Sequence, residues 1–400
     1  MSRAQPAGPK PRVAVIAPVL GIPSEVWIER QCRFFTRVTP VLAGWSCHPS
    51  WTPPADIETH LLPGIFSPPP GLFRRGLRKL GLAEALAIGP AQRRQVAEAL
   101  AAMRADAVLC HFAWTAMHVA QAVPAGLPLI WHVHGRDVSA LLRGRAYRAM
   151  LVRQMPRAAA LVAVGHHQIE RLAPFGLPPR TAVIPCGAPL DLFACAPLPV
   201  QAADGPLRFL SVGRMSAEKG MAESLRAFER IAGEFESAEL VLVGDGPELG
   251  ALQRRAAASP FAARIRLPGR LPPEEVAREM AGAQVFLQHS REIAGSVEGF
   301  GVTLAEAGAA GLPLLASSLG GLAEQIEPGD NGFLFFPGNV GAQAQLMRRL
   351  AADPALRARL GARARELAAR FDARRMTACL ELEILATLAP SAEPNKGTRA

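Results

Sequence analysis

Residues 208–220 read RFLSVGRMSAEKG, a short apolar run that ends at a glycine and leads through a polar loop into a helical pattern. An apolar run bounded in this way is typical of a buried strand in a parallel sheet. The stretch therefore predicts a strand followed by a helix, with Arg214 and Lys219 in the loop at the carboxyl end of the strand. Open parallel sheets bind their ligands at that end.

The same alternation recurs on both sides of this stretch. Strands are predicted in the first half at 12–17, 38–45, 108–112, 129–133, 161–164 and 182–185, and in the second half at 208–212, 240–243, 265–267, 285–288, 314–316 and 332–335. Helical patterns fill most of the intervals between them. The sequence therefore predicts an α/β protein with two doubly wound, Rossmann-like domains.

The domain boundaries follow from a proline-rich segment in the middle of the chain. Residues 188–206 contain several prolines and little periodicity, so we expect an interdomain linker there. The first domain then covers 10–187 and the second covers 207–370. A final helix is expected at 371–388, and the polar tail 389–400 is expected to be disordered.

The composition excludes several classes of protein. Half of the 400 residues are hydrophobic and 20% are charged, which is typical of a globular protein. The uncharged stretch 107–135 contains four histidines, two prolines and a glycine between them, so it predicts a strand, a helix and a strand and not a membrane helix. The net charge of +10 suits phosphate-bearing ligands or anionic membranes. No nucleic-acid-binding motif is visible, so nucleic acid is not an expected partner.

The cysteines and the N-terminus predict a cytoplasmic protein. Six cysteines occur without a C-x-x-C pair, which favours neither a zinc ribbon nor a disulfide framework. The apolar run 13–20 follows Lys10 and Arg12, as in a secretory signal, but Pro18 interrupts it and no cleavage site of small residues follows. We expect the first strand of a sheet there.

Arg214 and Lys219 are candidate ligands of a diphosphate. A guanidinium group binds phosphate oxygens as a fork and an ammonium group binds them as a point charge. The alternative is that both are ordinary solvated surface cations. The chain contains only four lysines among 44 basic residues, and this scarcity favours a specific role for Lys219.

A second candidate segment, residues 297–306, reads VEGFGVTLAE and places Glu298 and Glu306 eight positions apart. A glycine-rich turn lies between them and opens a helix, whose free amides and dipole attract anions. Glu306 is placed to accept hydrogen bonds from ribose hydroxyls, and Glu298 from sugar hydroxyls. The alternative, an acidic residue that merely favours a helix N-terminus, explains Glu306 but not Glu298 or the paired glycines.

These two segments resemble those of the retaining glycosyltransferases of family 4, whose GT-B fold has two Rossmann-like domains facing each other across a cleft. The resemblance extends over about residues 10 to 385, and it includes WHVHGRD at 131–137, VIPCG at 183–187, GGLAE at 320–324 and NGFL at 331–334. The segments 18–31 and 111–114 are most similar to the colanic-acid-type branch, which builds bacterial surface polysaccharides.

The resemblance implies a hexosyltransferase-like enzyme that moves a sugar from a nucleoside-diphosphate sugar to a hydroxyl of a saccharide or lipid-linked acceptor. The sequence contains no D-x-D metal motif, and Arg214 and Lys219 can neutralise a diphosphate, so we expect neither a cofactor nor a metal. The catalytic residues that the resemblance implies would be His134, Glu298, Arg214 and Lys219, and the donor would be bound by Arg214, Lys219, Glu298, Gly299, Phe300, Gly301 and Glu306. His134 would reach the donor sugar from the first domain. His132 lies on the same strand face, so a metal pair is conceivable, but the sequence offers no third ligand at metal-site spacing.

Two other functions remain alternatives. The first is a nucleotide-sugar epimerase or a phosphorylase on the same fold, and the second is a non-catalytic subunit of a polysaccharide-assembly machine. We also expect peripheral attachment to the inner face of the cell membrane through residues 71–80, where the cations Arg74, Arg75, Arg78 and Lys79 accompany apolar residues at helical spacing. The alternative for this segment is an ordinary solvated helix face.

Overall fold

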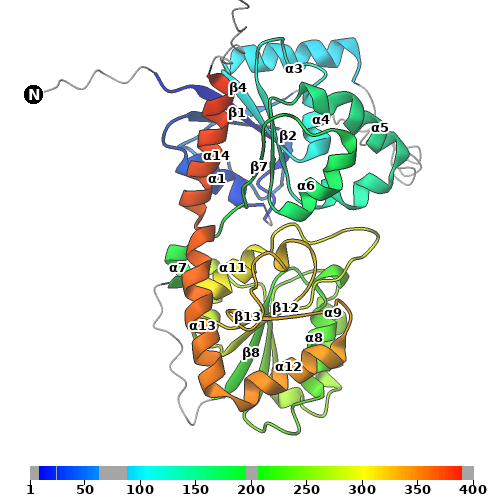
Figure 1. Cartoon of the computed structure of the whole chain (residues 1–400), viewed down its shortest axis with the longest axis vertical. Coiled ribbons are helices and arrows are strands. Elements are labelled where there is room, and N and C mark those ends of the chain that lie inside the picture. The colour runs from blue at the N-terminus through cyan, green and yellow to red at the C-terminus, as the bar shows by residue number, and fades with distance from the viewer. Residues whose placement is uncertain (1–8, 24, 63–87, 195–205, 390–400) are drawn as a thin grey trace, which may run out of the picture.

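The computed structural model describes residues 9–23, 25–62, 88–194 and 206–389. These residues form two α/β domains, one above the other in Figure 1. Each domain is built around a parallel sheet with helices on both faces, which confirms the predicted pair of doubly wound domains. Among the described residues, no helix combines the length and the apolar character needed to cross a bilayer.

The first domain contains a seven-stranded sheet with the order β3-β2-β1-β4-β5-β6-β7. Its strands are β1 (Arg12–Leu20), β2 (Thr39–Cys47), β3 (Glu58–Leu61), β4 (Ala107–His111), β5 (Leu129–Val133), β6 (Ala160–Ala163) and β7 (Thr181–Val183). Its main helices are α1 (Trp27–Phe34), α3 (Pro90–Ala102), α4 (Ala113–Val119), α5 (Arg145–Gln154) and α6 (His166–Leu172). The strand order reverses between β1 and β4, so a topological switch point lies there.

The second domain contains a six-stranded sheet with the order β10-β9-β8-β11-β12-β13. Its strands are β8 (Leu207–Val212), β9 (Ala238–Val243), β10 (Ile265–Gly269), β11 (Val285–Gln288), β12 (Leu314–Ser317) and β13 (Gly332–Phe335). The helices of this half are α7 (Leu190–Ala194), α8 (Met221–Glu229), α9 (Leu249–Ala257), α10 (Pro273–Ala281), α11 (Val302–Ala309), α12 (Val340–Ala352), α13 (Pro354–Ala368) and α14 (Ala373–Leu388). Here the switch point lies between β8 and β11.

Every predicted strand is present, and the ends that differ do so by one to three residues. Among the described residues, β3 is the one strand that was not predicted from the sequence. It has only four residues, and all of them are at least partly exposed at the edge of the sheet. An edge strand of this kind lacks the continuous apolar run by which buried parallel strands are recognised. The helix–strand pattern predicted for 107–135 is confirmed as β4, α4 and β5.

The last helix, α14, returns to the first domain after α13 and runs alongside α1 (Figure 1). Its Glu381 is only 1% exposed. The carboxylate accepts hydrogen bonds from the backbone amides of Thr36 at 2.7 Å, of Val38 at 3.0 Å and of Arg37 between them. The chain therefore crosses twice between the domains, once near α7 and once before α14.

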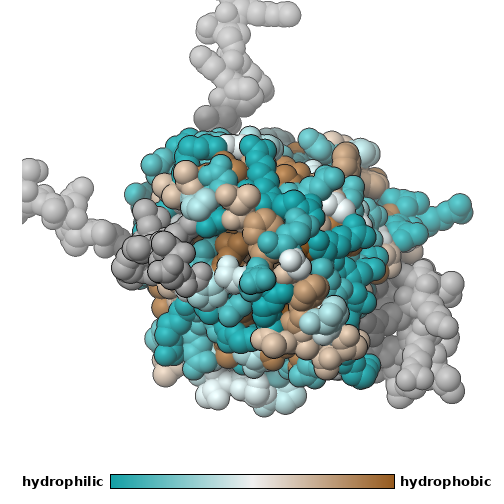
Figure 2. Space-filling view, turned by 90° about the horizontal axis from the view of Figure 1, so that it is seen from below, coloured by the Kyte–Doolittle hydropathy of each residue, from teal (hydrophilic) through white to brown (hydrophobic). Residues whose placement is uncertain are grey.

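The surface at the far end of the second domain is predominantly hydrophilic, with hydrophobic residues in small groups (Figure 2). The cationic segment 71–80, for which we predict membrane attachment, lies outside the described residues. The same holds for the tail 390–400 and for residues 195–205 of the predicted linker, whose described part contains α7.

Candidate active site

The loop after β8 packs tightly against the loop after β11. Gly220 has a left-handed conformation, with φ of 59°, at the start of α8. A Cβ atom at this position would lie 1.9 Å from the carbonyl oxygen of His289, so only glycine fits. The contact brings the two candidate segments of the sequence analysis together at the switch point of the second sheet.

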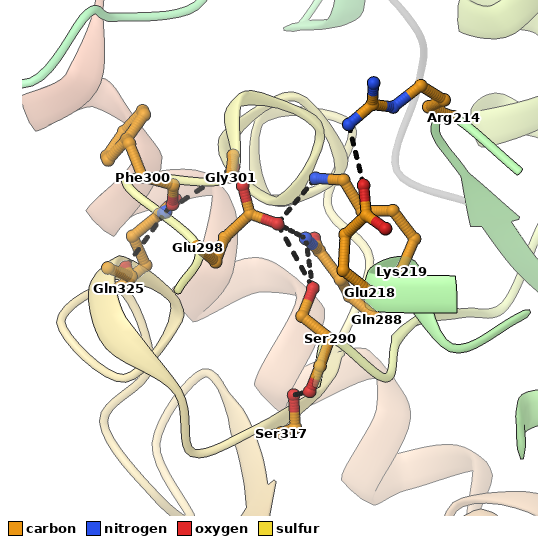
Figure 3. A network of polar contacts seen from close by, with 11 residues as sticks. Arg214, Glu218, Lys219, Gln288, Ser290, Glu298, Phe300, Gly301, Ser317 and Gln325 are labelled. Carbon is orange, nitrogen blue, oxygen red and sulfur yellow. Dashed lines mark hydrogen bonds and ion pairs between the residues drawn. The ribbon is translucent and has the colours of Figure 1, made fainter. Parts of the chain in front are cut away.

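Lys219 and Glu298 meet directly at this point (Figure 3). The Lys219 Nζ atom lies 2.5 Å from Glu298 Oε2, and the two side chains are 24% and 16% exposed. The same oxygen accepts a hydrogen bond from Ser290 Oγ at 3.2 Å, and Gln288 Nε2 lies 3.5 Å away. No hydrogen bond from the described part of the chain reaches Glu298 Oε1. One carboxylate oxygen is thus held by the protein, and the other is available to a ligand.

Arg214 lies in the same loop but binds a different carboxylate. Its Nη2 atom is 2.7 Å from Glu218 Oε1, and its side chain is 61% exposed. Burial acts to raise the pKa of Glu218, but its own backbone amide and the cations Arg214 and Lys219 outweigh this effect and lower the pKa. No pattern in the sequence singled out Glu218. Its carboxylate pairs with Arg214 and is influenced by the charge of Lys219, so an anionic ligand would have to compete with it for these two cations.

The turn before α11 has a different role for each of its three residues. Gly299 lies against the first domain, since a Cβ atom there would be 1.9 Å from the carbonyl oxygen of His134. Phe300 is 5% exposed and packs in the core against Phe371, with ring centroids 5.2 Å apart. Gly301 has φ of 80° and caps the helix. Phe300 therefore offers a ligand no side chain, and its main-chain oxygen already accepts a hydrogen bond from Gln325 Nε2. Its backbone amide lies beside those of Val302 and Thr303, the first residues of α11, which need a partner outside the helix.

Glu306 lies on the half-buried face of α11, and the charge of Arg30 in the first domain acts on the pKa of its carboxyl group. Burial raises its pKa to about 7, and the guanidinium group of Arg30 on α1 opposes this rise. Arg30 Nη2 also donates a hydrogen bond to the carbonyl oxygen of Gly187 at 3.1 Å. Arg30 could not be predicted from the sequence as a site residue, because Gly187 and Glu306 are far from it along the chain.

The imidazole of His134 points into the first domain. The residue is 8% exposed, and its Nε2 atom is 3.1 Å from His111 Nδ1. Its Nδ1 atom is 3.5 Å from Cys186 Sγ. Burial, together with His132 and His111, holds the pKa of His134 well below its usual range. The role of His134 at the donor sugar stays a prediction, and in this structure only its main-chain oxygen reaches the second domain.

In the structure a third histidine, His111, lies beside His132 and His134. This neighbour was not predicted from the sequence. It ends β4, and it is paired in register with His132 on the neighbouring strand β5. Its distance along the chain matches no metal-binding motif. Only the pairing of two parallel strands brings it to the other two.

The turn after β5 is fixed by Asp137, which is 1% exposed. Its carboxylate accepts hydrogen bonds from the backbone amides of Ala113 at 2.9 Å and Gly135 at 2.8 Å. Close by, Ser139 Oγ accepts a hydrogen bond from the backbone amide of Val297 at 3.3 Å. The turn thereby joins the first domain to the loop that carries Glu298.

Comparisons with known proteins agree with this architecture. Residues 47–192 match the family model described as Glycosyltransferase Family 4, and residues 199–367 match the one described as Glycosyl transferases group 1. The chain is 34% identical over 146 residues to the amylovoran biosynthesis glycosyltransferase AmsK of Erwinia amylovora, an alignment that covers 36% of each chain. It is 27% identical over 253 residues to the putative colanic acid biosynthesis glycosyltransferase WcaL of Escherichia coli K12, which covers 62% of this chain and 61% of that one.

Solved structures show the same fold over nearly the whole chain. Anabaena HepE in complex with UDP superimposes with a TM-score of 0.73 and 17% identity, covering 94% of this chain and 100% of that one. Sucrose-phosphate synthase from Thermosynechococcus elongatus superimposes with a TM-score of 0.72 and 19% identity, covering 93% and 98%. The two family models, which together match most of the chain, show that it belongs to the family 4 glycosyltransferases, and the solved structures show that it has their GT-B fold.

Proposed function

We propose that the chain transfers a sugar from a nucleoside-diphosphate sugar to an acceptor hydroxyl, with retention at the anomeric carbon. The observation that supports this most is the contact of Lys219 with Glu298 at the seam between the two domains. It joins a cation suited to a diphosphate and a carboxylate suited to a sugar at the switch point of the sheet, where ligands of this architecture bind.

The proposed chemistry is a displacement at the anomeric carbon. The bond from that carbon to the diphosphate oxygen breaks, the acceptor oxygen takes its place, and the hydroxyl proton passes to the leaving phosphate oxygen. Negative charge grows on the diphosphate, where Arg214, Lys219 and the first amides of α11 would stabilise it. Preorganised groups of this kind often supply the largest part of catalysis. The reaction then needs no divalent metal at the diphosphate.

The donor must compete with the protein's own carboxylates for these cations. Glu218 holds Arg214 and Glu298 holds Lys219 in the present structure. We infer that the diphosphate displaces Glu218 from Arg214. Glu298 would stay beside Lys219, where its free oxygen accepts a hydrogen bond from the sugar.

The biological acceptor is proposed from the relatives. AmsK is named for amylovoran biosynthesis and WcaL for colanic acid biosynthesis, and HepE has been solved with UDP-glucose as well as UDP. We therefore propose a saccharide or lipid-linked acceptor in the synthesis of a bacterial polysaccharide or glycolipid. The alignments span only 36% of AmsK and 61% of WcaL. The acceptor of this chain is therefore proposed, and is not taken over from those proteins.

Product analysis tests the proposed activity. The purified chain is incubated with each common nucleotide sugar, with and without a mixture of simple saccharide acceptors. We expect nucleoside diphosphate and a new glycoside, which has the anomeric configuration of the donor in NMR. Product without any acceptor would support the epimerase or phosphorylase alternative. No binding and no turnover with any donor would support the non-catalytic subunit.

Attachment to an anionic membrane is a separate proposal, which rests on the sequence of residues 71–80 alone. Vesicles that contain anionic lipid should sediment the wild type, and neutral vesicles should not. A variant with Arg74, Arg75, Arg78 and Lys79 all changed to Gln should stay in the supernatant. Equal sedimentation of both proteins, or of neither, would contradict the proposal.

A further inference from the structure

Three histidine rings converge beneath Trp27 at the carboxyl edge of the first sheet. His111 ends β4, and its register partner His132 lies on β5. His134 lies two residues beyond His132, and therefore on the same face of the sheet. One nitrogen of each ring lies within 4.8 Å of one nitrogen of each of the other two. All three side chains are buried: His111 and His132 are 0% exposed and His134 is 8% exposed.

Several of these nitrogens have no partner in the protein. Both ring nitrogens of His132 and the Nε2 atom of His111 are buried without a hydrogen bond. The main chain at Ile184 lies near enough to act on the pKa of His132, but it forms no hydrogen bond of acceptable geometry with either nitrogen. Buried polar atoms are nearly always hydrogen-bonded, and leaving them without a partner costs stability. An orphaned nitrogen of His132 that lies within 4.8 Å of a nitrogen of each of the other two rings therefore points to a missing ligand.

Packing alone does not account for the cluster. Trp27 contacts the rings of His111 and His134, with centroids 5.0 and 4.3 Å apart, so the cluster does contribute aromatic contacts. Phenylalanine would provide the same contacts without burying polar atoms. Phenylalanine would not provide three ring nitrogens that lie within 4.8 Å of one another.

The contacts of His134 indicate which of its nitrogens would bind a ligand. Its Nδ1 atom faces Cys186 Sγ at 3.5 Å, so this nitrogen is placed to donate its hydrogen to the sulfur. Its Nε2 atom then carries the lone pair and accepts a hydrogen bond from His111 Nδ1 at 3.1 Å, and a metal ion would replace the shared proton. Metal-binding histidines are commonly oriented by a hydrogen bond from the nitrogen that does not bind the metal.

We infer that His111, His132 and His134 form a binding site for one divalent transition-metal ion of the zinc class. Nitrogens bound to zinc at ~2.0–2.1 Å in a tetrahedral site lie ~3.3 Å apart, close to the 3.1 Å between His111 and His134. The ring of His132 moves inward to complete the set, and no hydrogen bond of its side chain holds it back.

Three imidazoles favour zinc, cobalt, nickel or copper over magnesium, calcium or manganese. Three protein ligands also leave a fourth position for water or another ligand. The ion holds β4 to β5, and it orders His134 and the turn whose main chain abuts Gly299 of the second domain. It has no part in binding the diphosphate, so this inference stands independently of the proposed function.

Metal binding is tested on the full-length chain, purified without a histidine tag. The protein is treated with a strong chelator, dialysed, and titrated with Co²⁺ while the visible absorption is recorded. We expect saturation at one equivalent, with the intense absorption bands of a tetrahedral cobalt site, and a rise in Tm on addition of Zn²⁺. Metal analysis of the protein as first purified should find about one transition-metal ion per chain.

Variants separate this site from metal binding at the surface. His132→Phe keeps the ring volume and removes both free nitrogens, and it should weaken Co²⁺ binding about tenfold or more and abolish the Zn²⁺-dependent rise in Tm. His111→Gln provides a second variant if the first does not fold. The control is His60→Gln, which removes a partly exposed imidazole paired with Glu58 and should bind Co²⁺ as the wild type does.

Two results would overturn the inference. The first is a wild-type protein that contains no transition metal as purified and gives no tetrahedral cobalt spectrum. The second is a folded His132→Phe variant with undiminished Co²⁺ binding. Neither experiment involves a sugar donor, so both results leave the proposed transfer reaction untouched.

Discussion

Glu324 of the second domain accepts a hydrogen bond from His167 Nδ1 of the first domain at 2.8 Å. The same carboxylate accepts hydrogen bonds from the backbone amides of His166 at 2.9 Å and His167 at 3.1 Å, where α6 begins. A carboxylate at the start of a helix is also favoured by the helix dipole. This contact therefore holds the two domains together beside the proposed donor site.

The contact predicts an acid-sensitive domain seam. Burial acts to raise the pKa of Glu324, but the hydrogen bonds from the His167 side chain and the two amides outweigh it and lower the pKa from 4.5 to about 2. A lowered carboxyl pKa stabilises the folded state above pH 4.5, and this contribution is lost as the pH falls from 4.5 towards 2. Glu324→Gln should thus unfold at a lower urea concentration than the wild type at pH 7.

The difference between these two proteins should shrink progressively below pH 4.5. Other carboxylates titrate in both proteins alike, so the difference in urea midpoint isolates Glu324. An equal difference at pH 7 and at pH 3 would show that the hydrogen bonds do not depend on the charge of Glu324.

Glu306 should give the donor reaction its pH dependence. Burial raises its pKa to about 7, against the opposing effect of Arg30. If the ionised carboxylate accepts the ribose hydroxyls, kcat/KM for the donor should rise as the pH increases through 7 and then level off, because this ratio reports groups of the free enzyme. The measurement is a pH profile of the wild type and of Glu306→Gln. A profile of Glu306→Gln that keeps the same rise would assign it to another group.

The two glutamates of the second segment should separate in their kinetics. Glu306→Gln should chiefly raise the KM for the donor, because ribose contacts change little between the ground state and the transition state. Glu298→Gln should instead lower kcat by ~30- to 1000-fold, which corresponds to ~2–4 kcal/mol for a preorganised charge beside the reacting sugar. Steady-state kinetics of both variants, with circular dichroism to verify folding, decide the matter. The reverse pattern would reject these assignments.

Turnover should not need a hard divalent ion. If Arg214 and Lys219 bind the diphosphate as proposed, they neutralise the charge that Mg²⁺ or Mn²⁺ would otherwise neutralise. Rates in excess EDTA should therefore equal rates with added Mg²⁺. Loss in EDTA that Mg²⁺ or Mn²⁺ restores would contradict this prediction. Recovery with Zn²⁺ alone would instead implicate the buried histidines.

Glu381 on α14 should be important for stability and not for catalysis. It is buried and accepts hydrogen bonds from three backbone amides of the first domain. Glu381→Ala leaves these amides without partners, which costs about 3 kcal/mol or more. The matched control is Glu383→Gln on the same helix, whose pairing with Arg180 is partly exposed and contributes less than ~1 kcal/mol. Equal urea midpoints for both variants would show that α14 contributes little to holding the domains.

The sequence predicted the two sheets because their strands are apolar runs, a signal that is local to each strand. It also placed Lys219 in the loop after a strand and Glu298 in the loop that opens a helix, and these two side chains meet in the structure. What it could not predict depends on contacts between distant segments. These include the electrostatic effect of Arg30 on Glu306, the return of α14 to the first domain and the approach of His111 to His132. Each is decided by tertiary packing, for which a single sequence carries no periodic signal.

The most direct test of the donor site is the affinity of Lys219→Gln for the nucleoside diphosphate, measured by calorimetry. UDP, GDP and ADP are first screened against the wild type, and the tightest ligand is used. The control is Arg255→Gln, which removes an ion pair with Glu229 on α8. Neither of these residues is proposed to bind the donor. Losing one hydrogen bond to a charged group corresponds to ~1.5–3 kcal/mol, so we expect Lys219→Gln to bind ~10- to 100-fold more weakly while the control binds normally. Wild-type affinity in a folded Lys219→Gln variant would contradict the account.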